Sequence, residues 1–577
     1  SGGLFSRPLT ICSPRAADGL AMSLIEENNG KSHCDVELRS AYASSASGVF
    51  TATLTDRETG TTFSTLTKKL SIKRGKPTRV SVPYDKYRMC LLTATYTDAK
   101  TGKVLSDSKN LKYILTPAAP ATPRFNNAPL YGVRPGSPVI YRFPVSGEKP
   151  MKFTSDNLPE GLQLSESDGA LSGRIDKPCE LTFTVMAENA RGKASQEFTL
   201  KVGEHMIGLT PPMGWNSWNC WGLSISQEKV MSSTQALIDK GLADYGYGYI
   251  NIDDGWEAEE RNPDGTIEAN TKFPSMKGMI DWLHERGLKF GIYSSPGETT
   301  CGGYLGSLGH EKQDAEVWNK WGVDYLKYDW CSYERVREQD NDWGFASCMR
   351  PYLLMQEFVR EQPRDIFYSL GPLGGTQVYL WGLYCDGNSW RTAQDINDTW
   401  ASILDVGFRQ QAGKAKYSSV GHWNDPDMLV VGKVGWGSDL RETRLTPDEQ
   451  YTHITLWTLL ASNMLIGCDI AQMDDFTLNL LCNNEVNAVN QDVLGKQADR
   501  VSKEGDIEVW SRPLADGAIA VGIFNIGDKN QQVDMKSLIP AETTKTIRDL
   551  WRQQDLSASE LNCTIPAHGC RYLKVFL

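Results

Sequence analysis

The sequence predicts a multidomain protein: a (β/α)8 TIM barrel followed by an antiparallel β-sandwich and preceded by two β-sandwich domains of immunoglobulin-like type. Three observations predict this fold class. The chain has 577 residues, enough for several domains. Apolar and polar residues alternate with period two before about residue 205 and after about residue 495. Between these positions, strand-like and helix-like patterns alternate over roughly 290 residues, which is the size of such a barrel.

The N-terminal part is predicted to form two β domains, over residues 1–116 and 117–204. Segments such as GVFTATLTDRETGTTFSTLT and CLLTATYTDAKTGKVL alternate with period two around turn signals, a pattern typical of antiparallel strands. The Pro- and Ala-rich stretch Thr116–Phe125 lies between the two domains and is expected to be semi-rigid. The segment ELTFTVMAENARGKASQEFTLKV then favours a small immunoglobulin-like sandwich.

The barrel is predicted over residues 205–494 and the last β-sandwich over residues 495–577. Eight strand-like segments occur in the barrel region: PMGWNSW, YGYIN, KFGIYSS, VDYLKYDWC, DIFYSLG, SWRTAQD, GHWNDPDML and NMLIGCD. Helical patterns lie between them. In PSMKGMIDWLHERGL, for example, the apolar residues share one helical face and Gly287 is a stop signal. Period-two segments such as GAIAVGIFNIG and CRYLKVFL return after the barrel.

Composition limits the possible functions. The formal net charge is −11, so neither a nucleic acid nor an anionic membrane is an expected partner. No apolar run of about 18 residues occurs, so no membrane span is predicted. The chain holds only 7 His, none at a predicted strand end, so neither a His-based metal site nor a Ser–His triad is expected. The 13 Cys include no C-x-x-C pair, which argues against a zinc ribbon.

Acidic side chains cluster where the predicted strands end. They are Asp253, Asp254, Asp329, Asp395, Asp425 and Asp427. In barrels of this kind the active site forms at the C-terminal ends of the strands. A pocket rich in carboxylates and rimmed by aromatic rings suits glycoside hydrolysis, which needs two carboxyl groups in different roles.

Each carboxylate also has a structural interpretation. Asp329 beside Lys327 is compatible with a structural ion pair. The Asp253-Asp254 pair and Asp395 are compatible with helix caps, and Asp425-Pro426-Asp427 is compatible with a turn. Taken one at a time, these positions are explained at least as well by the structural interpretation as by a role in an active site. The coincidence of all these residues at successive strand ends of one barrel favours an active site.

Seven motifs occur in order along the second half of the chain: PPMGWNSWN, NIDDGW, GIYSS…TCGG, YLKYDWC, WRTAQDINDTW, WNDPDML and NQDVLGKQ. Together they resemble glycoside hydrolase family 27, the family of α-galactosidases and α-N-acetylgalactosaminidases. The resemblance covers about residues 209–577 and leaves the two N-terminal domains outside. It implies a retaining glycosidase built on a barrel with a C-terminal β-sandwich.

The resemblance implies which carboxylates are catalytic. Asp329 matches the nucleophile in the family's K-[YF]-D-x-C motif, and Asp395, four residues after Arg391, matches the acid/base. Retaining enzymes hold two such carboxyl groups roughly 5–5.5 Å apart. Lys327 and Arg391 resemble the family's sugar-binding cations and are expected to keep nearby carboxylates ionised. The implied mechanism is a double displacement that needs no metal and no organic cofactor.

The resemblance also implies how the sugar is bound. Asp253 and Asp254 resemble the pair that accepts hydrogen bonds from the O4 and O6 hydroxyls of galactose. Trp215 resembles the aromatic wall of the sugar site, and Tyr293 resembles the residue beside the nucleophile.

One disulfide, Cys301–Cys331, is implied by the resemblance, and it would fix the loop after the fourth strand near the nucleophile. Cys331 is therefore also counted among the residues beside the substrate. Cys220 and Cys385 are expected to stay outside disulfides, because the positions that match their partners in the family hold other residues.

The segment after the fifth strand departs from the family. Its α-galactosidases tend to carry a Glu there that reads the sugar O2, whereas this chain has YSLGPLGG. Either the small residues, with Gly371 counted as substrate-binding, make room for a 2-acetamido group, or another loop around Gln377 reads O2. A β-L-arabinopyranoside is a third possible substrate, and the retained Asp253-Asp254 pair argues mildly against it. Release of terminal α-D-galactose is the first choice of function.

A non-catalytic carbohydrate-binding protein is the alternative from another class, and the intact Asp329 and Asp395 pair argues against it. The N-terminal domains are interpreted as spacers, and the expected partner is a galactose-terminated glycan. A disulfide, appended β-sandwich domains and an activity on glycans favour an exported protein, secreted, periplasmic or at the cell surface. The sequence leaves the oligomeric state and the natural linkage open.

Overall fold

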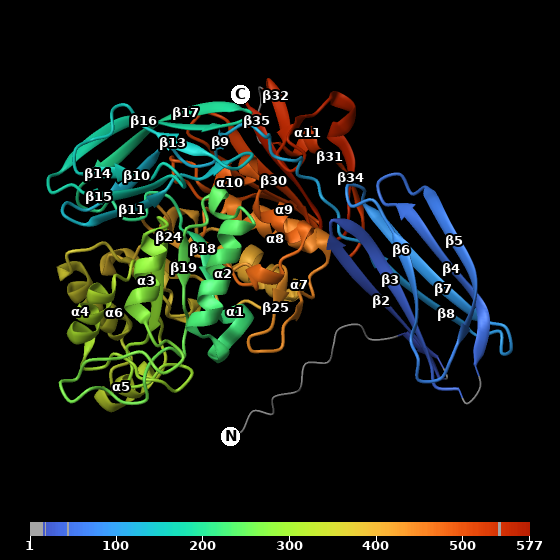
Figure 1. Cartoon of the computed structure of the whole chain (residues 1–577), viewed down its shortest axis with the longest axis horizontal. Helices are drawn as coiled ribbons and strands as arrows, with labels where there is room; N and C mark the ends of the chain where they lie inside the picture. The colour runs from blue at the N-terminus through green and yellow to red at the C-terminus, as the bar shows by residue number, and fades with distance from the viewer. Residues whose placement is uncertain (1–14, 18, 43–44, 540–543) are drawn as a thin grey trace. The chain divides into compact units, whose positions relative to one another are not determined.

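The computed structural model in Figure 1 describes residues 15–17, 19–42, 45–539 and 544–577. The chain divides into two compact units. The first consists of the chain up to residue 116 with the short segments 444–450 and 474–480, and the second consists of the remainder. Among the described residues, no helix is both long and apolar enough to cross a bilayer.

The first domain is a β-sandwich of two four-stranded antiparallel sheets, in the orders β1-β2-β3-β6 and β5-β4-β7-β8, drawn in blue in Figure 1. Its strands are β1 (Arg15–Ala17), β2 (Leu20–Asn29), β3 (Lys31–Ser40), β4 (Ala46–Asp56), β5 (Thr62–Ile72), β6 (Thr78–Pro83), β7 (Cys90–Asp98) and β8 (Val104–Asn110). Buried positions alternate along β4, so the period-two pattern marks the face that packs into the core. Leu24 and Val36 of one sheet share this core with Phe50 and Leu92 of the other.

The second domain is a smaller β-sandwich built around the sheets β10-β17-β16-β13 and β11-β15-β14. Its strands are β9 (Arg124–Phe125), β10 (Leu130–Val133), β11 (Pro138–Arg142), β12 (Val145–Ser146), β13 (Lys152–Thr154), β14 (Leu162–Leu164), β15 (Ala170–Arg174), β16 (Cys179–Asn189) and β17 (Gly192–Val202). The long hairpin β16–β17 lies within the segment that the sequence predicts as strands. Phe143, Phe183 and Phe198 form its aromatic core.

The third domain is the predicted barrel, a curled sheet of eight parallel strands in the order β24-β23-β22-β21-β20-β19-β18-β27. The strands are β18 (Met213–Asn216), β19 (Tyr249–Asn251), β20 (Lys289–Ser294), β21 (Tyr325–Tyr328), β22 (Phe367–Leu370), β23 (Ser389–Arg391), β24 (Trp423–Asp425) and β27 (Met464–Ile466). Each lies in one of the eight predicted segments. A bridge between Leu429 and Ile466 joins the two ends of the sheet, so the barrel closes.

Helices connect the barrel strands, and two more, α9 and α10, follow the last strand. They are α1 (Trp218–Trp221), α2 (Gln227–Asp239), α3 (Met276–His284), α4 (Glu311–Trp321), α5 (Tyr333–Asp340), α6 (Phe345–Glu361), α7 (Trp400–Ser402), α8 (Pro447–Leu459), α9 (Asp475–Leu481) and α10 (Asn484–Asn490). The apolar residues predicted to share one face of α3, from Met276 to Leu283, are buried. Helix α4 ends at Gly322, whose φ of 98° is in the left-handed region that glycine adopts without strain.

The C-terminal domain is an antiparallel β-sandwich, with a six-stranded sheet in the order β28-β29-β30-β35-β32-β33 and the pair β31–β34. Its elements are β28 (Asp499–Glu504), β29 (Ile507–Pro513), β30 (Ile519–Asn525), β31 (Gln531–Asp534), α11 (Met535–Leu538), β32 (Thr546–Asp549), β33 (Gln554–Asp555), β34 (Asn562–Ile565) and β35 (Cys570–Phe576). Val521 and Leu573 belong to the apolar core that joins the two sheets. The predicted fold class is confirmed.

Candidate active site

The carboxyl ends of neighbouring barrel strands carry the residues that the sequence singles out. Asp253 and Asp254 follow β19, Lys327 lies in β21 with Asp329 directly after it, and Arg391 ends β23. Because parallel strands point the same way, these ends meet at one face of the barrel. The fold therefore gathers side chains that lie far apart in the chain.

Asp253 is fully engaged by the protein. Its Oδ2 accepts hydrogen bonds from Lys327 Nζ at 2.7 Å and from Asn216 Nδ2 at 3.0 Å. Its Oδ1 accepts one from the backbone N–H of Asp254 at 3.0 Å. Burial alone would lower the pKa of Lys327, but the charges of Asp253 and Asp329 raise it overall. Lys327 therefore stays a cation, and its ion pair is with Asp253 rather than with the neighbouring Asp329.

Asp254 is only partly engaged. Its side chain is buried, and Oδ2 accepts a hydrogen bond from the backbone N–H of Gly302 at 2.5 Å. Oδ1 is buried and has no hydrogen-bond partner among the described residues. Burial raises the pKa of Asp254 to about 6, and the charges of Asp253 and Asp329 add to the rise, while hydrogen bonds with the Thr300 side chain and the Gly302 backbone oppose it. A buried carboxylate oxygen that lacks a partner is costly, so Asp254 Oδ1 would be stabilised by any hydrogen-bond donor that reaches it.

Asp329 is held at the end of β21 by side chains and backbone. The hydroxyl of Tyr293 donates to its Oδ2 at 2.6 Å, and the backbone N–H of Trp330 donates to its Oδ1 at 2.9 Å. Its own backbone N–H donates to the carbonyl of Ser294 at 2.9 Å. Burial raises the pKa of Asp329, while the charge of Lys327 and these hydrogen bonds oppose the rise. The result is a fixed, half-buried carboxylate beside a cation, which is what a nucleophile needs.

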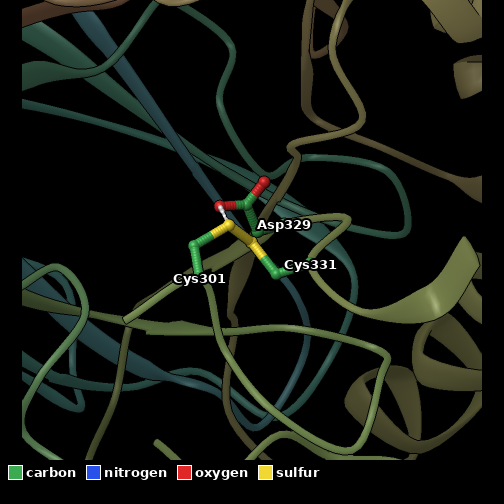
Figure 2. Close-up of side chains that lie close together, drawn as sticks. All are labelled: Cys301, Asp329 and Cys331. Atoms are coloured by element: carbon green, nitrogen blue, oxygen red, sulfur yellow. Dashed lines mark hydrogen bonds between the residues drawn. A yellow bond between two sulfur atoms is a disulfide. The ribbon is translucent and has the colours of Figure 1, made fainter. Parts of the chain in front are cut away.

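The loop after β21 is fixed by the disulfide Cys301–Cys331, which confirms the predicted pairing. Figure 2 shows the Asp329 carboxylate next to this disulfide, with Cys301 Sγ 4.0 Å from Oδ2. The two Sγ atoms and one carboxylate oxygen of Asp329 lie within 4.8 Å of one another. Because both sulfurs are in the disulfide, neither offers a thiolate to a metal ion. Cys220 and Cys385 are outside disulfides, as expected.

Asp395 is held by a buried arginine. Nη2 of Arg391 donates to Asp395 Oδ1 at 3.0 Å and also lies 2.9 Å from Oδ2 of the buried Asp427. Desolvation favours the neutral form of Asp395, but the charges of Arg391 and Lys327 lower its pKa overall. The side chain is 75% exposed, so water weakens this effect. The exposed carboxylate of Asp395 is thus anchored to a buried cation.

The structural interpretations of these carboxylates as caps are wrong for three of them. Helix α3, the next long helix after the Asp253-Asp254 pair, is preceded by Ser275, and the N-cap of α7 is Thr399 rather than Asp395. Asp425 does stabilise a turn, because its Oδ1 accepts from the N–H of Asp427 at 2.8 Å. Burial raises the pKa of Asp425 to about 6. The turn interpretation is therefore correct for this motif.

Two predicted substrate-binding residues have structural surroundings that the sequence does not reveal. Trp215 in β18 is fully buried, and its Nε1 donates to the carbonyl of Cys468 at 2.9 Å. Gly371 follows β22, and a Cβ added there would lie 2.8 Å from the Cα of Asp329 and 2.9 Å from the carbonyl oxygen of Tyr328. The space beside Gly371 is therefore filled by the backbone that carries Asp329.

Sequence reasoning missed Tyr352 and Asn216. Tyr352 lies in α6, and its hydroxyl donates to the backbone carbonyl of Asp329 at 2.6 Å. It is distant from Asp329 in the chain, and no local signal links the two. Asn216 donates a hydrogen bond to Asp253. Asn216 lies at the end of the first barrel strand, and this position could have indicated that it belongs to the site. Asp427 lies at a predicted strand end but is not among the predicted catalytic residues, and the structure places it against Arg391.

Comparisons with known proteins identify the family. A family model described as "Alpha galactosidase A" matches residues 210–492, the model "Alpha galactosidase C-terminal beta sandwich domain" matches 504–575, and an Ig domain model matches 122–203. An α-galactosidase of Cyamopsis tetragonoloba is 39% identical over 378 residues, which are 64% of this chain and 87% of that protein. The chain belongs to the α-galactosidase family, glycoside hydrolase family 27. It is therefore an enzyme of the glycoside hydrolase class.

Solved structures are similar to this chain over different fractions of its length. The crystal structure of α-galactosidase I from Mortierella vinacea is 31% identical with a TM-score of 0.58, covering 65% of this chain and 98% of that chain. A crystal structure from Bacteroides fragilis is 36% identical with a TM-score of 0.73, covering 79% of this chain and 98% of that chain. The Bacteroides fragilis structure covers more of this chain than the barrel and the C-terminal sandwich together, so its similarity extends into the part before the barrel.

Proposed function

We propose that the protein is a retaining exo-α-galactosidase that releases terminal α-D-galactose from oligo- or polysaccharides. The observation that carries the proposal is the fixed carboxylate of Asp329, bonded by Tyr293 and adjacent to the Lys327–Asp253 ion pair, in a chain of the α-galactosidase family. The relatives from Cyamopsis tetragonoloba and Cellvibrio japonicus, at 39% and 35% identity, are α-galactosidases.

In the first step, the carboxyl of Asp395 gives its proton to the glycosidic oxygen while Asp329 attacks the anomeric carbon. The bond to the leaving group breaks and a galactosyl ester of Asp329 forms. In the second step, Asp395 takes a proton from water, which attacks the same carbon and frees Asp329. Two inversions retain the configuration of galactose. Neither step needs a metal or an organic cofactor.

The two carboxylates have environments that suit these different roles. Asp395 must be protonated to act as an acid, although Arg391 lowers its pKa in the free enzyme. A bound sugar displaces water from this exposed side chain, and desolvation favours the neutral form. When the ester forms, Asp329 loses its negative charge, so Asp395 ionises more readily and becomes a base.

Galactose recognition is assigned to the pair after β19. Asp253 has its oxygens engaged by the protein, whereas Asp254 Oδ1 has no partner among the described residues. A sugar that lacks the matching hydroxyl would leave this buried oxygen unpaired, so the site would reject it. This argument favours galactose over arabinopyranose, which lacks the C6 hydroxymethyl group.

The acetamido-sugar alternative gains no support from Gly371. The space that a side chain at position 371 would need is occupied by the backbone of Asp329, so it is not free for a sugar substituent. Gln377, with a left-handed φ of 53°, lies on the wall of the cavity beside Asp329 and remains available to read O2.

The test is parallel release of p-nitrophenol from the α-D-galactopyranoside, the α-N-acetyl-D-galactosaminide and the β-L-arabinopyranoside, each with an Asp329→Ala control. The proposal predicts that the α-galactoside is cleaved best and that the variant is inactive. Faster cleavage of either other sugar would contradict the substrate assignment. Binding of galactose without any cleavage would move the protein to the carbohydrate-binding class.

An exported location is part of the proposal. The Cys301–Cys331 disulfide supports it, because disulfides persist in oxidising compartments. Fractionation of the source cells with an antibody against the barrel would test the location, and recovery of the whole pool in the cytosol would contradict it.

A further inference from the structure

A cavity of about 620 Å³ opens beside the nucleophile, a volume typical of small-ligand sites. Asp329 lies on its wall, and so does Gln394, the residue before Asp395. In a double displacement the nucleophile and the acid flank the bond that breaks. A cavity lined by the nucleophile and by the residue next to the acid therefore adjoins the place where the leaving group would sit.

Two exposed aromatic side chains form the outer wall of this cavity. Trp343 lies between α5 and α6 and is 56% exposed, and Phe345 at the start of α6 is 50% exposed. Large apolar side chains that are exposed side by side on a cavity wall commonly mark a ligand groove. Gln394 lines the same cavity, and its amide offers hydrogen-bonding groups.

The aromatic wall is held in place by other side chains. The guanidinium of Arg337 lies 5.1 Å from the ring of Trp343 and 5.8 Å from the ring of Trp330. Its Nε donates to Ser347 Oγ at 2.9 Å. Trp330 Nε1 donates to Glu334 at 2.8 Å. Such a cluster fixes the ring of Trp343 before any ligand arrives, which lowers the entropy cost of binding.

The same cluster connects to the nucleophile. The ring of Trp330 is stacked on that of Tyr352, with centroids 6.1 Å apart and planes at 9°. The hydroxyl of Tyr352 donates to the backbone carbonyl of Asp329 at 2.6 Å. The aromatic wall and the catalytic carboxylate are thus parts of one packed arrangement.

We propose that Trp343 and Phe345 form a leaving-group subsite that stacks on the sugar ring attached to the terminal galactose. This inference rests on the proposed function and assigns to two residues the recognition of its leaving group. An aromatic face with a flanking amide matches a sugar ring, which has apolar C–H faces and hydroxyl edges. The subsite contributes binding to the leaving group and not to the galactose.

The experiment compares two galactosyl donors. Melibiose has glucose as its leaving group, whereas α-D-galactosyl fluoride has a single atom that cannot reach Trp343. The double variant Trp343→Ala/Phe345→Ala should lower kcat/KM for melibiose at least about 10-fold and change that for the fluoride less than about 2-fold. Trp343→Phe, which keeps an aromatic face, should retain most of the activity on melibiose.

The control is Tyr384→Ala, which removes an aromatic ring that is 74% exposed but does not line the cavity. It should leave both donors unaffected. Equal losses on both donors in the double variant would overturn the inference, because they would indicate displacement of Asp329. Unchanged activity on melibiose would overturn it too, as expected of a surface that binds a protein. If the unmodified enzyme cleaves neither donor, the proposed function itself fails.

Discussion

Replacement of Gly371 by Ala should damage catalysis without touching the substrate. The added Cβ would lie 2.8 Å from the Cα of Asp329 and 2.9 Å from the carbonyl oxygen of Tyr328. Ordinary van der Waals contacts between carbon atoms are about 3.5–4.0 Å, so the end of β21 or β22 must move by roughly 0.7 Å. Productive geometry tolerates about 0.5 Å, and a misplacement of about 1 Å costs up to about 100-fold in rate.

We therefore expect Gly371→Ala to lower kcat/KM for an α-galactoside about 10- to 100-fold. Overpacking should also lower the free energy of unfolding by about 1–3 kcal/mol. The assays are p-nitrophenol release and urea denaturation. The matched control is Gly375→Ala, further along the same loop, where an added Cβ meets nothing within 4 Å. The control should stay within about 0.5 kcal/mol of the unmodified protein. Unchanged activity and stability in Gly371→Ala would refute the reasoning.

Three further variants test single side chains of the site. Asp329→Asn should remove measurable turnover of an α-galactoside, because an amide cannot form the ester, while the circular dichroism spectrum stays unchanged; residual activity above about 1% would contradict this role. Burial raises the pKa of Asp254 to about 6 in the folded protein, above its value in the unfolded chain. The folded protein is therefore destabilised when this carboxyl is ionised above about pH 6, and the destabilisation disappears as the pH falls. Asp254→Asn should therefore raise the free energy of unfolding by about 1–3 kcal/mol at about pH 8 and by less at about pH 5. The variant should also be inhibited more weakly by galactose. Equal stability of the variant and the unmodified protein at about pH 8 would contradict this prediction. Arg391→Met should lower the free energy of unfolding by about 3–5 kcal/mol, because Asp427 would keep a buried charge without its partner. It should also raise the pKa of Asp395, which must be protonated to act as the acid, so a pH–rate profile would show the alkaline limb shifted to higher pH.

Much of the barrel could be predicted because its signals are local. The strands lie in short segments rich in apolar and aromatic residues, and most of these segments end in polar residues, so the amino-acid sequence alone locates the eight segments and their carboxylates. Parallel topology then requires the strand ends to meet. The roles of Asp329 and Asp395 had a different source: spacing alone left the ion-pair and cap interpretations open, and the family motifs decided between them.

What could not be predicted depends on contacts between distant segments. Tyr352 reaches the carbonyl of Asp329 from the far end of a long connection, and helical periodicity gives no reason to select it. The glycine at position 371 suggested room for a substituent, whereas the structure shows a close approach between two strand ends. The cavity wall at Trp343 comes from a connecting segment, and such segments carry no periodic signal.

The most direct test of the account is the anomer of galactose that the enzyme releases first. Proton NMR during hydrolysis of p-nitrophenyl α-D-galactopyranoside follows the two anomeric signals before mutarotation mixes them. The account predicts that the α-anomer accumulates first, because Asp329 and then water each invert the anomeric carbon. First appearance of the β-anomer would mean a single displacement and would contradict the role of Asp329 as the nucleophile.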